Sequence, residues 1–399
     1  MKKVLFVTYG SGHVKMVLPV ARALAASGLA QPVVLALTTA APVVRESGLA
    51  LLQFKDFLTA ADAEALAQGH SLMASLNGQV VDELETAAYL GLSFSDLVAA
   101  VGRQEALARY ASHGRQAFVP VRTLQRILRQ VAPDVVVATN SPRAERAAIV
   151  AARELGIPSV CIVDLFAIDE VKWIGAPDYA DQVCVLNDSV KRFLVAAGRA
   201  AEQVSVTGNP GFDALFDPGL AAQGRDLRQR MGWQGRHVVL WPAQTEPAVH
   251  PFDGRAGDPS LPGTVLQALL EWVGTRDDCV LCVRPRAGEP AIDLPDDRRF
   301  VLTGQDWKLP PLLCATDLVV TLSSTVGLEG RLVGARLIQV LGSVFDEAMP
   351  VLRYGLVDEA VPAAALAPAL QRQIGQPRHG VTQATLATHK VLEVVRGFL

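Results

Sequence analysis

The segment Val4-Leu5-Phe6-Val7-Thr8-Tyr9-Gly10-Ser11-Gly12-His13 decides the fold of this chain. Its first half is an apolar run typical of a buried strand, and behind the glycines apolar residues recur with helical spacing. A strand that ends in glycines at the start of a helix places backbone N–H groups at the carboxyl edge of a sheet, where open α/β folds bind ligands. We therefore predict a site here, with His13 as a proton-transferring residue and with substrate contacts from Gly10, Ser11, Gly12 and Lys15. A tight turn without chemistry is the alternative.

Composition sets the frame for this interpretation. With 399 residues and a hydrophobic fraction of 50%, the chain predicts two domains of roughly 200 residues each. A net charge of −3 argues against a nucleic-acid partner. No apolar run approaches the ~20 residues that span a bilayer, so we expect a cytoplasmic protein. Cys279 and Cys282 lie three apart in an expected strand and are interpreted as core thiols. The oligomeric state stays open.

Strand-like and helix-like segments alternate along the chain, which indicates βαβ units. We predict an α/β protein with two doubly wound parallel sheets that face a central cleft. The expected domains are residues 1–212, with a helical insertion at about 57–130, and residues 213–380. Residues 381–399 are expected to form a C-terminal helix that packs back on the first domain. The end of the insertion carries Arg122, Arg126 and Arg129 on one helical face, which can contact an anionic membrane surface or remain a solvated face.

Polar residues follow several of the predicted strands. In the first domain, Asp164 comes directly after the apolar run 159–163 and is a second candidate for the catalytic site. Because the carboxyl ends of parallel strands meet at one edge of a sheet, other residues after strands are candidate substrate contacts. These are Asn140, Gly208 and Asn209 in the first domain and Gln244, Arg284 and Arg286 in the second.

The sharpest pattern of the second domain is Ser323-Ser324-Thr325-Val326-Gly327-Leu328-Glu329, which follows an apolar strand. Hydroxyl side chains and N–H groups at the start of a helix can hold a phosphate, and Glu329 is placed to accept hydrogen bonds from a ribose. An ordinary serine N-cap with a solvent-facing Glu is the alternative. For Arg284 and Arg286 the alternatives are a diphosphate contact and a surface ion pair.

Three of these motifs resemble those of GT-B glycosyltransferases. They are the Tyr9 to Val14 turn, Val206-Thr207-Gly208-Asn209-Pro210, and the Ser323 to Glu329 segment. The pattern is most similar to the N-acetylglucosaminyltransferase that makes lipid II and its relatives in cell-envelope glycan synthesis. The resemblance implies a GT-B fold, an acceptor site at Gly10, Gly12 and His13, and a nucleotide-ribose site at Ser323, Ser324, Thr325 and Glu329.

UDP-N-acetylglucosamine 2-epimerases share this fold, and Val14-Lys15-Met16 with Thr207-Gly208-Asn209 also resembles their motifs. Their His-Arg-Arg-Glu-Asn segment is replaced here by residues 241–246, Trp-Pro-Ala-Gln-Thr-Glu. The loop 247–262 likewise departs from the lipid II enzyme. Epimerisation or hydrolysis of a sugar nucleotide is therefore one alternative to transfer, and a non-catalytic binding or scaffold subunit is the other.

The expected function is a hexosyltransferase that moves a sugar from a nucleotide diphosphate donor, a UDP-sugar, to a hydroxyl of a glycan or lipid-linked acceptor. Retaining GT-B enzymes often have two Glu residues eight positions apart, whereas the positions eight before and after Glu329 are Thr321 and Leu337. The comparison with that family therefore implies inversion. His13, or failing that Asp164, would take the acceptor proton. No D-x-D segment ends a strand, so we expect no metal and no other cofactor. A cell-envelope acceptor places the enzyme in the cytoplasm, with peripheral contact at the inner membrane face.

Overall fold

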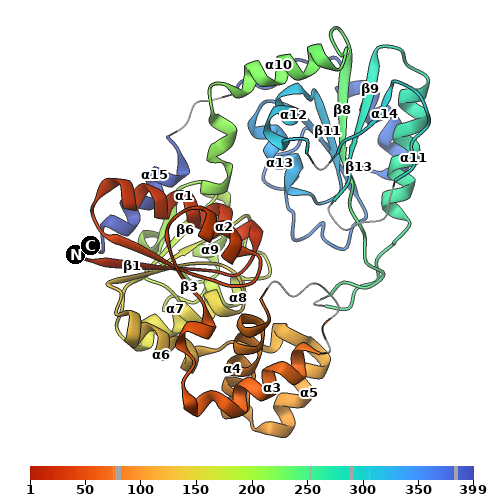
Figure 1. The fold of residues 1–399 in the computed structure, drawn as a ribbon. Helices are drawn as coiled ribbons and strands as arrows, with labels where there is room; N and C mark the ends of the chain where they lie inside the picture. Colours follow the sequence, from red (N-terminus) through yellow and green to blue (C-terminus); the bar gives the residue numbers. More distant parts are fainter. Residues whose placement is uncertain (75, 77–81, 252, 287–291, 305, 382–384) are drawn as a thin grey trace. The chain divides into compact units, whose positions relative to one another are not determined.

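A computed structural model describes residues 1–74, 76, 82–251, 253–286, 292–304, 306–381 and 385–399 (Figure 1). The chain divides into two compact units, each treated separately below. Unit 1 comprises Met1–Asp213 and Thr385–Leu399, and unit 2 comprises Ala214–Ala384. Each unit is built on one parallel sheet with interspersed helices, as predicted.

The sheet of unit 1 has seven parallel strands in the order β3-β2-β1-β4-β5-β6-β7. The order reverses between β1 and β4, so the loops after these two strands diverge and leave room for a ligand at the carboxyl edge. Near-continuous Val, Leu and Ile runs form the central strands because both faces of the sheet are covered. The strands are Lys3–Thr8, Gln31–Ala36, Ala50–Leu52, Val135–Thr139, Ser159–Ile162, Gln182–Val185 and Val204–Val206, numbered β1 to β7.

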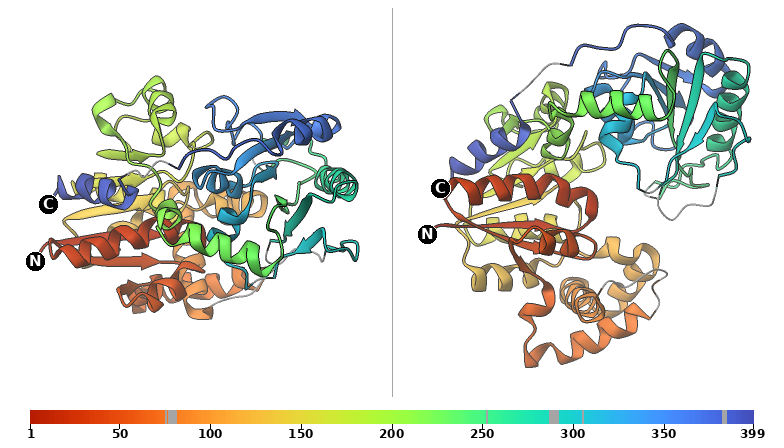
Figure 2. Two further views of the ribbon diagram at one scale, coloured as in Figure 1. Left: turned by 90° about the horizontal axis from the view of Figure 1, so that it is seen from above. Right: turned by 45° about the horizontal axis from the view of Figure 1, so that its top comes forward.

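Helices cover both faces of this sheet (Figure 2). On one face α1 (Ser11–Ser27) lies beside α15 (Ala387–Arg396), and Val391 and Val395 of α15 join the core with Val14. The Asp213 carboxylate accepts hydrogen bonds from the first N–H groups of α15, at 2.8 and 2.7 Å. The remaining helices of the sheet are α2 (Ala40–Glu46), α7 (Ala144–Glu154), α8 (Val171–Ile174), α9 (Asp188–Ala196) and the short η4 (Ala201–Gln203) and η5 (Pro210–Phe216).

The segment between β3 and β4 is helical (Figure 1). It comprises η1 (Phe54–Phe57), η2 (Ala60–Asp62), α3 (Ala63–Met73), α4 (Glu83–Val101), α5 (Arg103–His113), η3 (Gly114–Ala117) and α6 (Val121–Val131). Helices α3 and α4 cross at two glycines. A Cβ on Gly69 would lie 1.9 Å from the Ala87 carbonyl oxygen, and one on Gly91 would lie 1.9 Å from that of Ala65.

Helix α4 is long and apolar enough to cross a membrane by length and composition, which the sequence interpretation did not expect. However, 56% of the apolar window is buried within the structure, as in a core helix of a folded domain. The carboxylate of Glu85 on this helix is also buried, and it accepts hydrogen bonds from the N–H groups of Phe54 at 3.1 Å and Lys55 at 2.9 Å. Helix α4 is therefore fastened to η1 as part of the insertion.

The basic face of α6 is divided between solvent and protein. Arg122 and Arg129 are exposed, whereas Arg126 donates to both carboxylate oxygens of Asp62, at 2.8 and 3.0 Å. The opposite face, with Leu124, Ile127 and Leu128, is buried. One of the three arginines thus has an internal partner.

Unit 2 has a six-stranded parallel sheet in the order β10-β9-β8-β11-β12-β13, with its reversal between β8 and β11. Strands β8 to β13 are His237–Pro242, Cys279–Arg284, Phe300–Leu302, Leu318–Thr321, Arg336–Leu341 and Glu359–Pro362. Cys279 and Cys282 are buried free thiols in β9. The helices are α10 (Leu220–Arg230), α11 (Leu261–Gly274), α12 (Leu309–Ala315), α13 (Thr325–Leu332), η6 (Ala363–Ala365) and α14 (Leu366–Gln373).

Gly91→Ala is expected to destabilise unit 1, because its methyl group would occupy the position of the Ala65 carbonyl and force α3 and α4 apart. Overpacking of this kind costs about 1–3 kcal/mol or more. The matched control is Gly263→Ala in α11, an exposed helical glycine where an added methyl group would meet no atom within 4 Å, which should be neutral or slightly stabilising. Urea unfolding followed by circular dichroism measures both, and equal midpoints would contradict the close crossing.

Candidate functional site

Two carboxyl groups, Asp164 and Glu170, are held together at the carboxyl edge of the first sheet. Asp164 follows β5, and Glu170 directly precedes α8. The Asn140 side-chain amide, after β4, donates to Asp164 Oδ1 at 2.9 Å and to Glu170 Oε1 at 3.3 Å. Its Oδ1 accepts from the Asp164 backbone N–H at 3.1 Å. The predicted residues Asn140 and Asp164 therefore meet, together with Glu170, which the sequence analysis missed.

The environment of Glu170 brings its pKa close to neutral pH. Burial and the negative charge of Asp164 raise the pKa of Glu170 from 4.5 to about 7, and the Asn140 hydrogen bond acts in the opposite direction. A carboxyl group with a pKa near 7 can give or accept a proton at physiological pH. Perturbed carboxyl groups at a sheet edge are typical of functional sites.

Asn209 holds the backbone of Asp164 through a further hydrogen bond. It lies after β7, and its amide donates to the Asp164 carbonyl oxygen at 2.7 Å while its Oδ1 accepts from Gly211 N–H at 2.8 Å. Gly208 adopts φ of +83°, a conformation that favours glycine. Asn209 thus fixes the backbone that carries Asp164, and Gly208 provides the turn that precedes Asn209.

The turn from β1 to α1 is open at its glycines. Gly10 is the extended N-cap residue of α1, Ser11 is its first residue, and nothing lies within 4 Å of where a Cβ on Gly10 or Gly12 would be. Lys15 is exposed, and its backbone lies beside the Gly211 loop. This turn is therefore next to the loop that carries Asn209.

His13 has an acidic neighbour that the sequence analysis did not single out. Its Nδ1 is buried and has no hydrogen-bond partner among the described residues. Glu145, in α7, is fully buried, and its Oε1 accepts from the Tyr9 backbone N–H at 2.6 Å. Burial raises the pKa of Glu145, and the nearby His13 and Arg143 act in the opposite direction. The only signal in the sequence was a lone Glu in an alanine-rich helix, which usually indicates a solvated position.

In unit 2, Gln244 shapes the loop before α13. Its Oε1 accepts hydrogen bonds from Thr321 Oγ1 at 3.0 Å and from the N–H groups of Leu322 and Ser323 at 3.1 and 3.3 Å. Its Nε2 donates to Ser323 Oγ at 3.2 Å. The predicted residues Gln244 and Ser323 are therefore in direct contact at the carboxyl edge of this sheet.

A serine caps the start of α13. Ser324 is the N-cap residue, and its Oγ accepts from Val326 N–H at 3.3 Å. Thr325 is exposed, and Glu329 is half-buried one turn further along. The predicted segment thus presents a helix start and a carboxylate on the same element.

The two arginines after β9 differ in their surroundings. Arg284 ends the strand, and its Nη1 donates to the Trp307 carbonyl oxygen at 3.0 Å, whereas Arg286 is exposed. A residue that the analysis missed, Glu246, is buried and accepts from Ser343 Oγ at 2.8 Å and Val344 N–H at 2.7 Å. Glu246 joins the loops after β8 and β12.

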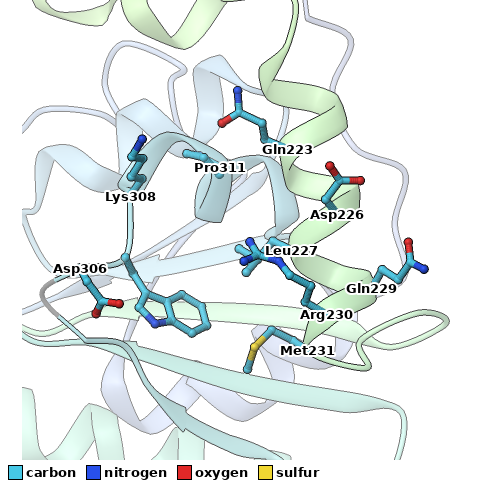
Figure 3. Close-up of a pocket in the computed structure, with 10 residues that line it drawn as sticks. Gln223, Asp226, Leu227, Gln229, Arg230, Met231, Asp306, Lys308 and Pro311 are labelled. Atoms are coloured by element: carbon cyan, nitrogen blue, oxygen red, sulfur yellow. The ribbon is translucent and has the colours of Figure 1, made fainter.

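Unit 2 also has a pocket of about 950 Å³ between α10 and the segment before α12 (Figure 3). None of the residues predicted from the sequence lines it. Its walls carry both charges, with Asp226 and Arg230 on α10 and Asp306 and Lys308 opposite. Among the residues that the structure describes, no cluster of three or more His, Cys, Asp or Glu could hold a metal ion.

No family model and no curated protein matches this chain. Solved structures do share its fold over the full length. The S. aureus MnaA-UDP co-structure is 11% identical with a TM-score of 0.61, covering 100% of this chain and 97% of that chain. The UDP-GlcNAc 2-epimerase of Methanocaldococcus jannaschii is 12% identical with a TM-score of 0.61, covering 100% of both chains. A putative UDP-N-acetylglucosamine 2-epimerase from Listeria monocytogenes is 14% identical with a TM-score of 0.61, covering 100% and 96%. The predicted two-domain, GT-B-like α/β fold is confirmed.

Glu170→Gln is expected to stabilise unit 1 at alkaline pH. Between pH 4.5 and about 7 the folded state keeps a proton on Glu170 that the unfolded state releases, so this residue lowers the free energy of unfolding as the pH rises through that window. This rise in pKa lowers the free energy of unfolding by at most about 3 kcal/mol above pH 7 and has no effect below pH 4.5.

Urea unfolding at pH 4, 6 and 8 measures this difference between the variant and the original chain. Burial also raises the pKa of Glu85 to about 7. Glu85 is present in both proteins, so its contribution to the pH dependence of stability is the same in each. Glu202→Gln removes an exposed carboxyl of the same unit and should leave the profile unchanged. A variant with no gain at pH 8 would show that Glu170 titrates normally.

Proposed function

We propose that this chain is an enzyme of UDP-linked sugars that moves a proton at the sugar ring through Asp164 and Glu170, in an epimerase or hydrolase type of reaction. The observation that carries the proposal is the pair of carboxyl groups held by Asn140, one of them with a pKa of about 7. Support also comes from the solved structures with this fold that are described as UDP-GlcNAc 2-epimerases.

Inversion by proton exchange removes a proton from one face of a carbon and delivers a proton to the other. At C2 of a UDP-sugar the electron pair of the broken C–H bond can form a C1–C2 double bond as the C1–O bond to UDP breaks, and addition of a proton at C2 and of UDP or water at C1 completes epimerisation or hydrolysis. Two carboxyl groups in one site can share this work when one is a base while the other holds a proton. Glu170, whose pKa is raised to about 7, is proposed to be the acid of the pair, and Asp164 the base. Asn140 orients both groups, and Asn209 fixes the backbone of Asp164.

Unit 2 is proposed to supply the nucleotide contacts. The N–H groups at the start of α13 suit a phosphate, Glu329 suits the ribose hydroxyls, and Arg286 is an exposed cation after β9. In this proposal Gln244 keeps the loop before α13 in shape through its four hydrogen bonds.

An inverting, metal-independent transferase is the second candidate. It is favoured by residues 241–246, which lack the basic segment of the epimerases, and by the proximity of His13 to the buried Glu145. In that case His13 would deprotonate a hydroxyl of a glycan or lipid-linked acceptor in cell-envelope synthesis, at the cytoplasmic side of the membrane. Gly10, Ser11, Gly12 and Lys15 would then contact that acceptor.

Exchange of the hydrogen next to the anomeric carbon separates the two candidates. UDP-GlcNAc incubated with the protein in D₂O should gain deuterium at C2 and show epimerised or free sugar by NMR, without an acceptor. Glu170→Gln and Asp164→Asn should each lower the exchange rate by about 10²–10⁴-fold, because each removes one proton-transfer group. Asp169→Asn, the adjacent carboxyl that Asn140 does not hold, should keep most of the rate. Acceptor-dependent release of UDP without any exchange would reject the first proposal in favour of transfer.

Glu329→Ala should weaken UDP binding by about 1–3 kcal/mol if its carboxylate bonds the ribose. Isothermal titration of UDP measures the change, with Glu271→Ala on the exposed face of α11 as the control for a lost carboxylate in the same unit. Glu170→Gln should bind UDP as the original chain does, because Glu170 is proposed to act on the sugar and not on the nucleotide. An unchanged affinity in Glu329→Ala would remove this residue from the nucleotide site.

A further inference from the structure

A cluster of two tyrosines and two arginines lies where the helical insertion meets the first sheet. We call it the Tyr9 cluster, and it consists of Tyr9, Tyr89, Arg115 and Arg143. Tyr9 follows β1, Tyr89 lies on α4, Arg115 belongs to η3, and Arg143 is the N-cap residue of α7. Residues from three other elements thus surround the Tyr9 side chain.

Both guanidinium groups contact Tyr9. The Arg143 guanidinium carbon lies 3.9 Å from the ring centroid, and Arg115 Nη1 donates to the Tyr9 hydroxyl at 3.1 Å. The Tyr9 ring is 9% exposed and lies 5.6 Å from the ring of Tyr89. Tyr89 in turn packs edge-on against Phe54 and Phe118 of the insertion. Both guanidinium groups therefore contact a tyrosine that packs against the aromatic side chains of the insertion.

The Tyr89 hydroxyl is buried without a partner. The residue is 2% exposed, and its hydroxyl has no hydrogen-bond partner among the described residues. Its electrostatic neighbours are Tyr9, Arg143, Glu145 and Arg115, so the hydroxyl faces the cluster. Burial raises its pKa well above 10, which keeps the proton available for donation. An unsatisfied buried donor is costly and rare in folded proteins, which indicates that a ligand completes it.

The cluster also has an excess of positive charge. No carboxylate of the described residues lies within 4.0 Å of Arg115 or Arg143, and the Nε of Arg143 is buried without a partner. By contrast, Arg126 pairs with Asp62 in the same unit at 2.8 Å. The nearby acid, Glu145, already accepts from Tyr9 N–H with one oxygen, and its burial favours the neutral form.

We propose that the Tyr9 cluster binds a phosphoryl group. The cluster offers the N–H donors of two guanidinium groups and the hydroxyl of Tyr89, and no acidic residue lies in the first turn of the adjacent helix α1. A tetrahedral dianion has enough oxygen atoms to accept from all of these donors, whereas a planar carboxylate has two. The N-terminal N–H groups of α1 favour the same charge.

The phosphoryl group can come from the diphosphate of a nucleotide or from a second phosphorylated molecule. The shared chemistry is the phosphate itself, so the binding is independent of which reaction Asp164 and Glu170 perform. The helical insertion would then contribute to selection of a phosphorylated ligand, through Tyr89 and Arg115.

Inorganic phosphate is the direct probe. Thermal unfolding at constant ionic strength should show a phosphate-dependent rise in Tm that acetate and chloride do not give. Arg143→Gln should weaken the apparent phosphate affinity by at least tenfold, Arg115→Gln by about three- to tenfold, and Tyr89→Phe measurably. Arg146→Gln is the matched control, because Arg146 is on the same helix and stacks on Trp173 at 5.0 Å. It should bind phosphate as the original chain does.

Further measurements distinguish the two phosphorylated ligands and cover the case of a variant that does not fold. Glu170→Gln should retain phosphate binding, so a failed proposal on catalysis would not imply failure here. A matching loss of UDP affinity in Arg143→Gln assigns the cluster to the nucleotide diphosphate. Unchanged UDP affinity with lost binding of glucose 1-phosphate assigns it to a second phosphorylated molecule. If Arg143→Gln does not fold, Tyr89→Phe and Arg115→Gln carry the test. Retained phosphate affinity in the folded variants, or equal stabilisation by acetate, would overturn the proposal.

Discussion

The hydrogen bond from the Tyr9 backbone N–H to Glu145 is the interaction on which the organisation of unit 1 depends. It joins two residues 136 positions apart, across the point where the strand order reverses between β1 and β4. The reversal makes the loops after these strands diverge, and a buried carboxylate holds them in register. Burial raises the pKa of this carboxyl group, and the Tyr9 N–H bond and the nearby Arg143 oppose that rise only in part. The hydrogen bond is strong because its surroundings exclude water.

The central strands could be predicted from the sequence because strands buried on both faces are continuous apolar runs. The short edge strands β3 and β13 could not, since Ala50–Leu52 and Glu359–Pro362 have three and four residues and mixed composition. Asn140 and Asp164 could be predicted as well, because each comes at the end of one of these apolar strands. Glu170 was not, because it lies six residues beyond Asp164 in a segment without periodicity, and only the fold returns it to the Asn140 amide.

The helical insertion shows why composition alone misleads. Helix α4 has the length and hydropathy of a membrane span, but these apolar residues pack against α3, η1 and α6. A helix that is hydrophobic around most of its surface is either lipid-exposed or surrounded by protein, and burial of 56% of its apolar window is typical of the second. Close backbone approach at Gly69 and Gly91 is a tertiary feature, which no periodic pattern in a single helix reveals.

The position of α15 in the core of unit 1 has a consequence for how the polypeptide matures. Val391 and Val395 complete an apolar cluster whose other members begin at Val4, while the whole of unit 2 is encoded between them. During vectorial synthesis the apolar face of α1 that α15 covers therefore stays uncovered until the ribosome has made all of unit 2. Unit 2 has every strand of its own sheet before that moment. The strands of both sheets thus emerge before α15, and only the covering of α1 has to wait for this later-made helix.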